Sequence, residues 1–263
     1  MKRSIVCALV VAASLLAPNA FGTSTTDTTD LWYHVGKSGK GVQIVQTGKF
    51  LFVTVYIYGS DGNPFWITGE LQLATDAFAF TGPVYVNTGP PFNGPFNPDN
   101  VTSRVAGTMS FTATSVTTGT LYYTLDGVVV TEALQRQPLT LDDYSGVYGS
   151  LRTYTRKGCH DPQLNGTNFV GEVVTIIHNG SAMKVKLEGE AVTCTIDGAY
   201  TQSGRVGQLF GPYSCTSGEA GYTYLYELSQ APNRFTARQK VTTSNIGCIT
   251  EGELVALTPH ETP

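Results

Sequence analysis

The chain has 263 residues, 41% of them hydrophobic and 14% charged, which supplies ample apolar material for a core. Its formal net charge of -4 gives no reason to expect binding to nucleic acid or to an anionic membrane surface. Glycine and tyrosine are plentiful, with 29 and 14 residues, and windows rich in alanine, leucine and glutamate are missing. The composition therefore favours β-structure.

The first 22 residues have the features of a signal peptide. Lys2 and Arg3 precede an apolar run at residues 5–16, and residues 20–22 offer small side chains at the spacing that a signal peptidase recognises, so the mature chain is expected to begin near Thr23. The apolar run is shorter than the roughly 20 residues that span a bilayer, and no later stretch approaches that length. We expect a secreted or periplasmic protein that does not span a membrane.

Short apolar runs alternate with turn signals along the first half, as is typical of antiparallel β-structure. Asp61-Gly62 and Asp126-Gly127 are predicted hairpin turns, because both central positions of a type I′ turn need a positive φ that Asp and Gly tolerate. A linker at residues 139–146 then separates a first domain from a second. The predicted domains are residues 23–138 and 147–263, and the strands predicted in the first are 41–46, 50–58, 64–71, 77–86, 104–113, 120–125 and 128–136.

The second half follows the same pattern. Placing Asn179-Gly180 at a hairpin turn pairs Ile176 with Met183 and gives one apolar and one mixed face, which supports a sheet with one buried side. The predicted fold class is all-β, with two tandem antiparallel barrels or sandwiches and essentially no helix outside the signal peptide. Barrels are favoured because closure removes exposed edges. An outer-membrane barrel is disfavoured, since residues 261–263 do not form a terminal strand.

Cysteine usage adds a covalent prediction. Cys7 falls in the predicted signal peptide, and an even number remains in an oxidising compartment, which indicates two disulfides rather than a zinc site without any Cys-x-x-Cys pair. Three pairings are possible. A turn at Ser203-Gly204 brings two of the cysteines almost opposite each other on neighbouring strands. The predicted pairs are therefore Cys194 with Cys215 and Cys159 with Cys248.

Familiar catalytic and cofactor motifs are missing from the sequence. Gly36-Lys37-Ser38 is not a phosphate-binding loop, because Leu31 stands where the first glycine is required and a strand, not a helix, follows. His178 beside Ser181 is the nearest approach to a catalytic pair, and a solvated hairpin end is the favoured interpretation. We expect no catalytic residue, cofactor or metal site.

The loop at residues 87–100 is long for a compact domain, and loops of this length are usually functional. Its prolines stiffen it. Phe92 and Phe96 either anchor the loop over one barrel end, which is the favoured interpretation, or line a ligand mouth as a lid.

Several motifs together resemble a known family. They resemble the repeat of an exported proteobacterial β-rich family that usually reads Trp-Trp, Glu-Ser-Gly-Trp-Gly, an aromatic strand, Asp-Gly-x-Pro-x-Trp and a Gly-Pro-Pro-Phe loop. The matching residues are Trp32-Tyr33, KSGKG at 37–41, Gly48, Phe52, Tyr58, DGNPFW at 61–66 and TGPPF at 88–92.

The second domain, with GAYTQSGRVGQLFGPYSC at 198–215, is similar to a four-cysteine companion domain in such proteins. The family is mostly uncharacterised and occurs alone or appended to secreted hydrolases. The resemblance therefore implies an accessory β-module and supplies no active-site residues. The chain departs from the repeat at Tyr33, Lys37 and Lys40, where the family has Trp, Glu and Trp, so this corner has changed its charge and lost an aromatic ring.

The leading functional hypothesis is a non-catalytic exported binding or interaction module that acts on an envelope or extracellular partner, protein or glycan. The alternatives are a lipocalin-like carrier of a small ligand and a secreted hydrolase or hydrolase inhibitor. A large apolar pocket favours the carrier, a polar cleft with a perturbed carboxylate or histidine favours the enzyme, and packed barrels with exposed aromatics favour the module. The candidate binding residues are Trp32, Tyr33, Lys37, Lys40, Phe92 and Phe96, which we expect to form an exposed surface.

Overall fold

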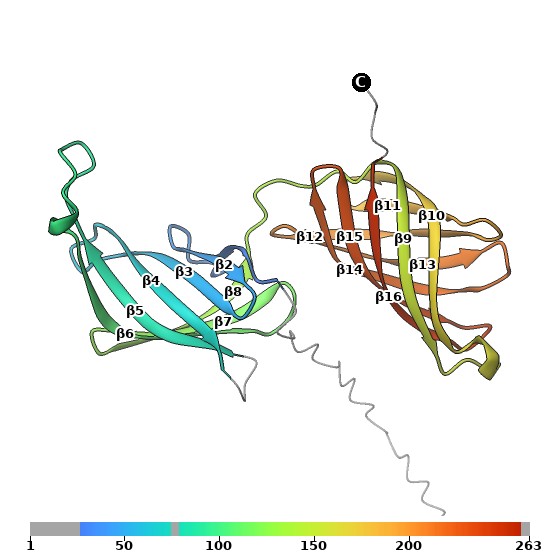
Figure 1. The fold of residues 1–263 in the computed structure, drawn as a ribbon, viewed down its shortest axis with the longest axis horizontal. Coiled ribbons are helices and arrows are strands. Elements are labelled where there is room, and N and C mark those ends of the chain that lie inside the picture. The colour runs from blue at the N-terminus through green and yellow to red at the C-terminus, as the bar shows by residue number, and fades with distance from the viewer. Residues whose placement is uncertain (1–26, 75–78, 259–263) are drawn as a thin grey trace, which may run out of the picture.

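The computed structural model describes residues 27–74 and 79–258, which form two closed antiparallel β-barrels in tandem (Figure 1). The predicted signal peptide, and residues 77 and 78 of one predicted strand, lie outside the described residues. The first barrel consists of β1 (Asp30–Tyr33), β2 (Gly41–Thr47), β3 (Phe50–Tyr58), β4 (Pro64–Leu73), β5 (Ala79–Thr88), β6 (Thr102–Ala113), β7 (Thr118–Leu125) and β8 (Val128–Arg136). A short 3₁₀ turn, η1 (Pro98–Asn100), lies between β5 and β6.

The second barrel is built in the same way and closes by pairing its first strand with its last. It consists of β9 (Gly146–Lys157), β10 (Gly166–Asn179), β11 (Ala182–Glu188), β12 (Thr193–Ser203), β13 (Val206–Cys215), β14 (Ala220–Ala231), β15 (Arg234–Thr243) and β16 (Ile249–Leu257), with η2 (Pro162–Leu164) between β9 and β10. The prediction of an all-β chain with two barrels is confirmed, and the sequence analysis missed only the short strand β1 of the first barrel.

The hairpin turns correct the sequence analysis in detail. Asp126 and Gly127 both have positive φ, as predicted for a type I′ turn. Only Gly62 has positive φ at the Asp61-Gly62 site, where residues 59–63 form a longer loop, so that prediction is wrong. The longer loop is closed by a hydrogen bond from the Gly59 N–H to the Asn63 carbonyl.

The predicted register of the β10–β11 hairpin is shifted by two residues. Asn179 pairs with Ala182, so Gly180 and Ser181 form the turn, and Ile176 lies opposite Val185 instead of Met183. Gly180 takes the positive φ that a type II′ turn requires at its first central position. A shift of two preserves the side-chain period, so the buried and exposed faces are as predicted.

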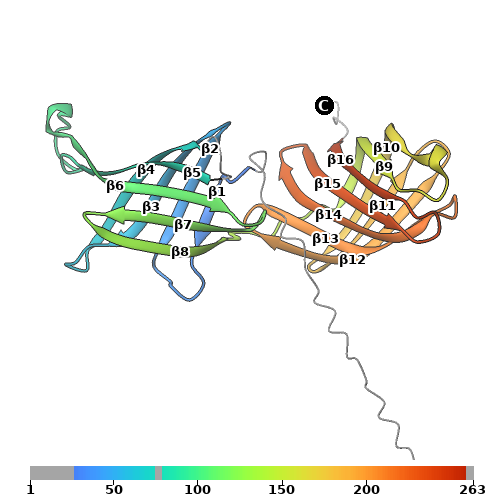
Figure 2. The same ribbon diagram turned by 90° about the horizontal axis from the view of Figure 1, so that it is seen from below.

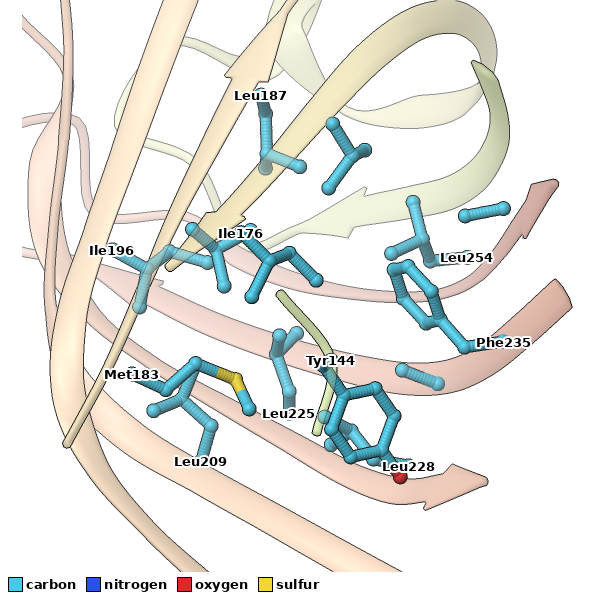
Figure 3. Close-up of a cluster of buried hydrophobic side chains, with 14 of the residues drawn as sticks. Tyr144, Ile176, Met183, Leu187, Ile196, Leu209, Leu225, Leu228, Phe235 and Leu254 are labelled. Carbon is cyan, nitrogen blue, oxygen red and sulfur yellow. The ribbon is translucent and has the colours of Figure 1, made fainter. Parts of the chain in front are cut away.

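Each barrel has its own apolar core. In the first barrel Trp32 is completely buried and packs edge-on against Phe111, with 5.3 Å between ring centroids. The core of the second barrel includes Tyr144, which comes from the predicted linker and packs against Phe235 (Figure 3). Tyr144 also packs against Tyr200. Part of the linker therefore closes the end of the second barrel at which the chain enters.

A turn of the second barrel meets the first barrel at a small polar junction (Figure 2). The N–H of Arg205 donates to Asp30, and the Ser203 hydroxyl donates to the Arg136 carbonyl. Arg205 also forms an ion pair with Asp27. Gly204 lies so close to the first barrel that a Cβ there would overlap an Asp30 carboxylate oxygen. The junction therefore requires glycine at this turn.

Both predicted disulfides are confirmed. Cys194 and Cys215 are directly opposite on β12 and β13, and Cys159 is bonded to Cys248. The turn between β12 and β13 is Gly204-Arg205, so the strand register again differs by two residues from the predicted one. The observed register places Cys194 directly opposite Cys215. Two disulfides indicate an oxidising, extracytoplasmic environment. Within the described ranges, no helix has the length and apolar character needed to cross a membrane.

Candidate functional site

A cavity of about 840 Å³ lies at the end of the second barrel opposite Tyr144. Because neighbouring strands are antiparallel, the loops that follow β9, β11, β13 and β15 all lie at this end. The volume falls within the range of roughly 300–1,000 Å³ that holds small-molecule ligands. Figure 1 shows the loop after β9 at the end of the barrel away from the linker.

A buried ion pair lies in the wall, toward the middle of the barrel. Arg152 on β9 contacts Glu172 on β10 through Nε–Oε1, at 2.9 Å, and Nη2–Oε2, at 3.0 Å. Both residues are 8% exposed. Nη1 of Arg152 also donates to Gln239 at 3.2 Å. Burial raises the pKa of Glu172, and the charge and hydrogen bond of Arg152 offset this only in part.

Three inward-facing residues of β9 lie in a row that runs from this ion pair toward the open end of the barrel. Arg152, Tyr154 and Arg156 alternate with residues of the outer face, as the two-residue period of a strand dictates. The guanidinium carbons of Arg152 and Arg156 lie 5.1 and 5.3 Å from the centroid of the Tyr154 ring, within cation–π range. Two permanent positive charges therefore line one wall of the cavity.

The two guanidinium groups differ in how well they are satisfied. Arg152 donates two hydrogen bonds, from Nη2 to Glu172 and from Nη1 to Gln239, and its Nε lies 2.9 Å from Glu172 Oε1 without the geometry of a hydrogen bond. Arg156 donates one hydrogen bond, from Nη2 to Glu219 at 2.8 Å, and its buried Nε has no hydrogen-bond partner among the described residues. The Arg156 side chain is 19% exposed and that of Glu219 is 11% exposed. Arg156 is thus the cation with donors to spare.

Apolar side chains form much of the remaining wall. Val241 is buried, whereas Leu164 and Val192, which come from η2 and the β11–β12 loop, are 36% and 38% exposed. The apolar residues of the lining include Leu164, Val170, Val192, Val241 and Ile246. The lining therefore combines charged and apolar side chains.

The two disulfides stabilise this end of the barrel. Cys194–Cys215 joins neighbouring strands in the cavity wall, and the Tyr213 hydroxyl donates to the Cys194 sulfur at 3.2 Å. Cys159–Cys248 connects the loop after β9 to the loop after β15. The shape of the cavity opening therefore depends on covalent bonds as well as on strand pairing.

The candidate catalytic pair, His178 and Ser181, is not arranged for catalysis, because His178 binds backbone groups. The His178 side chain is only 4% exposed, so the expectation of a solvated hairpin end is wrong for this residue. His178 Nδ1 accepts the Tyr144 N–H at 3.4 Å, and Nε2 is 2.8 Å from the Gly180 carbonyl, where it acts as donor. Both ring nitrogens thus hold backbone groups, while Ser181 is exposed in the turn.

The predicted surface on the first barrel is only partly exposed. Trp32 is 0% exposed and its indole Nε1–H donates to the Thr28 carbonyl, so its placement on a surface is wrong: β1 turns this side chain into the core. Tyr33 is half-buried, and Lys40 is exposed beside a small cavity of about 20 Å³. Lys37 forms an ion pair with Glu132 on β8 at 2.7 Å.

Phe92 and Phe96 are 101% and 72% exposed, so they do not anchor their loop to the barrel. In Figure 1 this loop projects away from the strands of the first barrel. The favoured interpretation as an anchor is wrong, since both rings lack the burial that an anchor requires. Their role in binding remains a hypothesis.

The sequence analysis missed Arg152, Arg156, Glu172 and Glu219. A usable signal was present, because Arg-x-Tyr-x-Arg places three large polar side chains on the face of β9 that also carries the buried Tyr148. Charged residues on a core-facing strand position need partners or a ligand. Comparison with known proteins adds no functional information, because neither a scan against protein-family models nor a search of curated proteins finds a match.

Proposed function

We propose that the chain is a non-catalytic, secreted or periplasmic binding protein whose second barrel carries a small ligand in the cavity at its open end. The observation that carries the proposal is the combination of about 840 Å³ of space with a lining that holds two arginines and the glutamates Glu172, Glu190 and Glu219. Pockets of this size with a few convergent polar groups are the usual form of a ligand site. Glu172 has a raised pKa, as an enzyme site could have, but its carboxylate is buried against Arg152. Both ring nitrogens of His178 are engaged with backbone groups, so we favour the carrier over the enzyme.

A cavity-blocking variant tests this function. Ala191 is an exposed residue at the cavity opening, so Ala191→Trp fills space there without disturbing the core. Ser181→Trp, at the opposite end of the same barrel, is the matched control. Titration calorimetry with a panel of neutral, cationic and anionic small molecules should find a ligand that binds the unmodified chain. Its affinity should fall at least tenfold in Ala191→Trp and stay unchanged in Ser181→Trp. Absence of any ligand, or equal binding to both variants, would contradict the proposal.

A second candidate function, attachment to an envelope or extracellular partner, is favoured by the outer face of the first barrel. Tyr56 on β3 and Trp66 on β4 are opposite each other and are 44% and 54% exposed. Exposed aromatic residues dominate many interfaces because they bury a large area and lose few rotamers. Trp66→Ala should reduce retention of the chain on isolated envelope material, whereas Val128→Ala, another exposed apolar residue of the barrel, should not.

A further inference from the structure

The charges in the cavity indicate the chemistry of the ligand, an inference that rests on the proposed function. Arginine stays protonated at any physiological pH, so Arg152 and Arg156 are permanent cations. The glutamates beside them, in contrast, can take up a proton or change their side-chain conformation. Since Arg152 is held by Glu172 and Gln239, it belongs to the framework of the barrel. Arg156 is the cation that remains available.

Glu219 occupies the position at which a ligand acid would be bound. It ends the turn between β13 and β14, where its backbone carbonyl accepts the Cys215 N–H at 2.8 Å. From there its carboxylate reaches across the barrel mouth to Arg156 Nη2. No other carboxylate contacts Arg156 among the described residues. The carboxylate of Glu219 thus satisfies one Arg156 donor and leaves Nε unsatisfied.

Apolar side chains elsewhere in the lining suit a hydrocarbon group, and one of them, Val170, pairs with Arg152 on the neighbouring strand. Val170, Val192 and Ile246 line the same cavity as Arg156, and Leu164 lies at its opening. Removal of apolar surface from water favours binding, whereas an arginine–carboxylate contact adds orientation and selectivity. A ligand that contacts both Arg156 and these apolar side chains would have one anionic end and one apolar end.

We propose that the second barrel binds an amphiphilic carboxylate, with the acid group on Arg156 and the hydrocarbon against the apolar side chains of the lining. Glu219 is an internal competitor, because its carboxylate must release Arg156, or share it, when the ligand binds. Removing the Glu219 charge should therefore strengthen binding of the ligand, and removing the Arg156 charge should weaken it. A purely structural ion pair has no reason to produce opposite effects on binding.

The test uses three probes that share one alkyl chain: dodecanoate, dodecanol and dodecylamine, each below its micelle concentration. The mature chain should bind dodecanoate at least tenfold more tightly than the other two, as measured by titration calorimetry. Arg156→Gln should lower the affinity for dodecanoate at least tenfold and leave dodecanol unchanged. Glu219→Gln should raise the affinity for dodecanoate at least threefold. Arg104→Gln removes a paired arginine from the first barrel and should change nothing.

Each outcome has a defined meaning. Equal affinity for the three probes, or weaker dodecanoate binding by Glu219→Gln, overturns the assignment of an acid ligand. If no alkyl probe binds but another compound binds in a manner blocked by Ala191→Trp, the ligand class is wrong and the carrier function stands. If Arg156→Gln does not fold, the affinity of Glu219→Gln for dodecanoate alone tests the assignment: a rise supports it and no rise overturns it. If no compound binds at all, both proposals fail.

Discussion

Asp30 and Arg136 form an almost fully buried ion pair at the junction of the two barrels, with 3.0 Å between Oδ2 and Nη1. The same carboxylate oxygen accepts the N–H of Arg205 from the second barrel. The Arg136 guanidinium also lies 4.8 Å from the ring centroid of Trp32. The core of the first barrel is therefore linked to the turn of the second through one carboxylate.

The junction can be weakened by one methyl group. Gly204 and Gly180 each occupy the first central position of a hairpin turn and have φ of 60°, so alanine costs about 1–2 kcal/mol of backbone strain at either site. A Cβ at Gly204 also meets Asp30, whereas a Cβ at Gly180 meets no atom within 4 Å. We therefore expect Gly204→Ala to separate the barrels and Gly180→Ala to leave them docked.

Chymotrypsin cleavage of the linker measures this difference. Leu139 and Leu141 are 75% and 73% exposed, and cleavage there requires the linker to bend into the protease. Gly204→Ala should be cut faster than Gly180→Ala under identical conditions. Equal cleavage of the two variants would show that the junction does not restrain the linker.

The fold was accessible from sequence because its determinants are local. The two-residue period and the turn residues identified nearly every strand of the first barrel, and both disulfide pairings followed from hairpin geometry. The register errors at Asn179 and Ser203 have one cause. At both turns glycine was predicted at the second central position but occupies the first. The two placements differ by a register shift of two residues that leaves the apolar face unchanged, so hydrophobicity cannot distinguish them.

The candidate site was less accessible, because it depends on which strands become neighbours. Arg152 and Glu172 are 20 residues apart and meet only because β9 and β10 pair in the observed register. Arg156 and Glu219 are 63 residues apart and meet only after the barrel closes. Trp32 was misplaced for a related reason. A four-residue strand shows too little alternation to reveal which side chain faces the core.

The two disulfides should differ in their contribution to stability. In the chain-entropy model, a crosslink between residues 89 apart is worth about 4.6 kcal/mol and one between residues 21 apart about 3.3 kcal/mol. The double change Cys159→Ala, Cys248→Ala should therefore lower the free energy of unfolding of the second barrel more than Cys194→Ala, Cys215→Ala does. Calorimetry of each variant checks the order.

Tryptophan fluorescence supplies the control for this experiment, because the only two tryptophans, Trp32 and Trp66, are in the first barrel. The fluorescence transition should be nearly the same in both cysteine variants. If the fluorescence transition instead moved to a lower temperature together with the transition of the second barrel, the two barrels would unfold as one unit.

The loop between β5 and β6 should be separable from the stability of its barrel. Phe92 is fully exposed, so Phe92→Ala should change the free energy of unfolding by less than about 0.5 kcal/mol. Phe111→Ala, in the core of the same barrel, should cost about 3–5 kcal/mol. Urea unfolding followed by tryptophan fluorescence compares the two. A large loss from Phe92→Ala would mean that the loop folds against the barrel in solution.

The buried carboxyl of Glu172 should give the second barrel a characteristic pH dependence. Burial raises its pKa above the ordinary value of 4.5, so the folded state holds the proton more tightly than the unfolded state. Its contribution to stability is therefore fully present below 4.5 and is lost as the pH rises through the folded pKa. Glu172→Gln cannot lose a proton, so the variant should gain stability relative to the unmodified chain as the pH rises from about 3 to about 8.

Asp126→Asn provides a control of opposite sign on the first barrel. The Arg104 hydrogen bonds hold the pKa of Asp126 below its ordinary value of 3.8, so its contribution is present above 3.8 and is lost as the pH falls through the folded pKa. Asparagine tolerates the positive φ at this turn. This variant should therefore lose stability relative to the unmodified chain as the pH rises, while Glu172→Gln gains it. Calorimetric scans across the pH range measure both slopes, and a Glu172→Gln slope of the same sign as that of Asp126→Asn would show that Arg152, not burial, controls the protonation of Glu172.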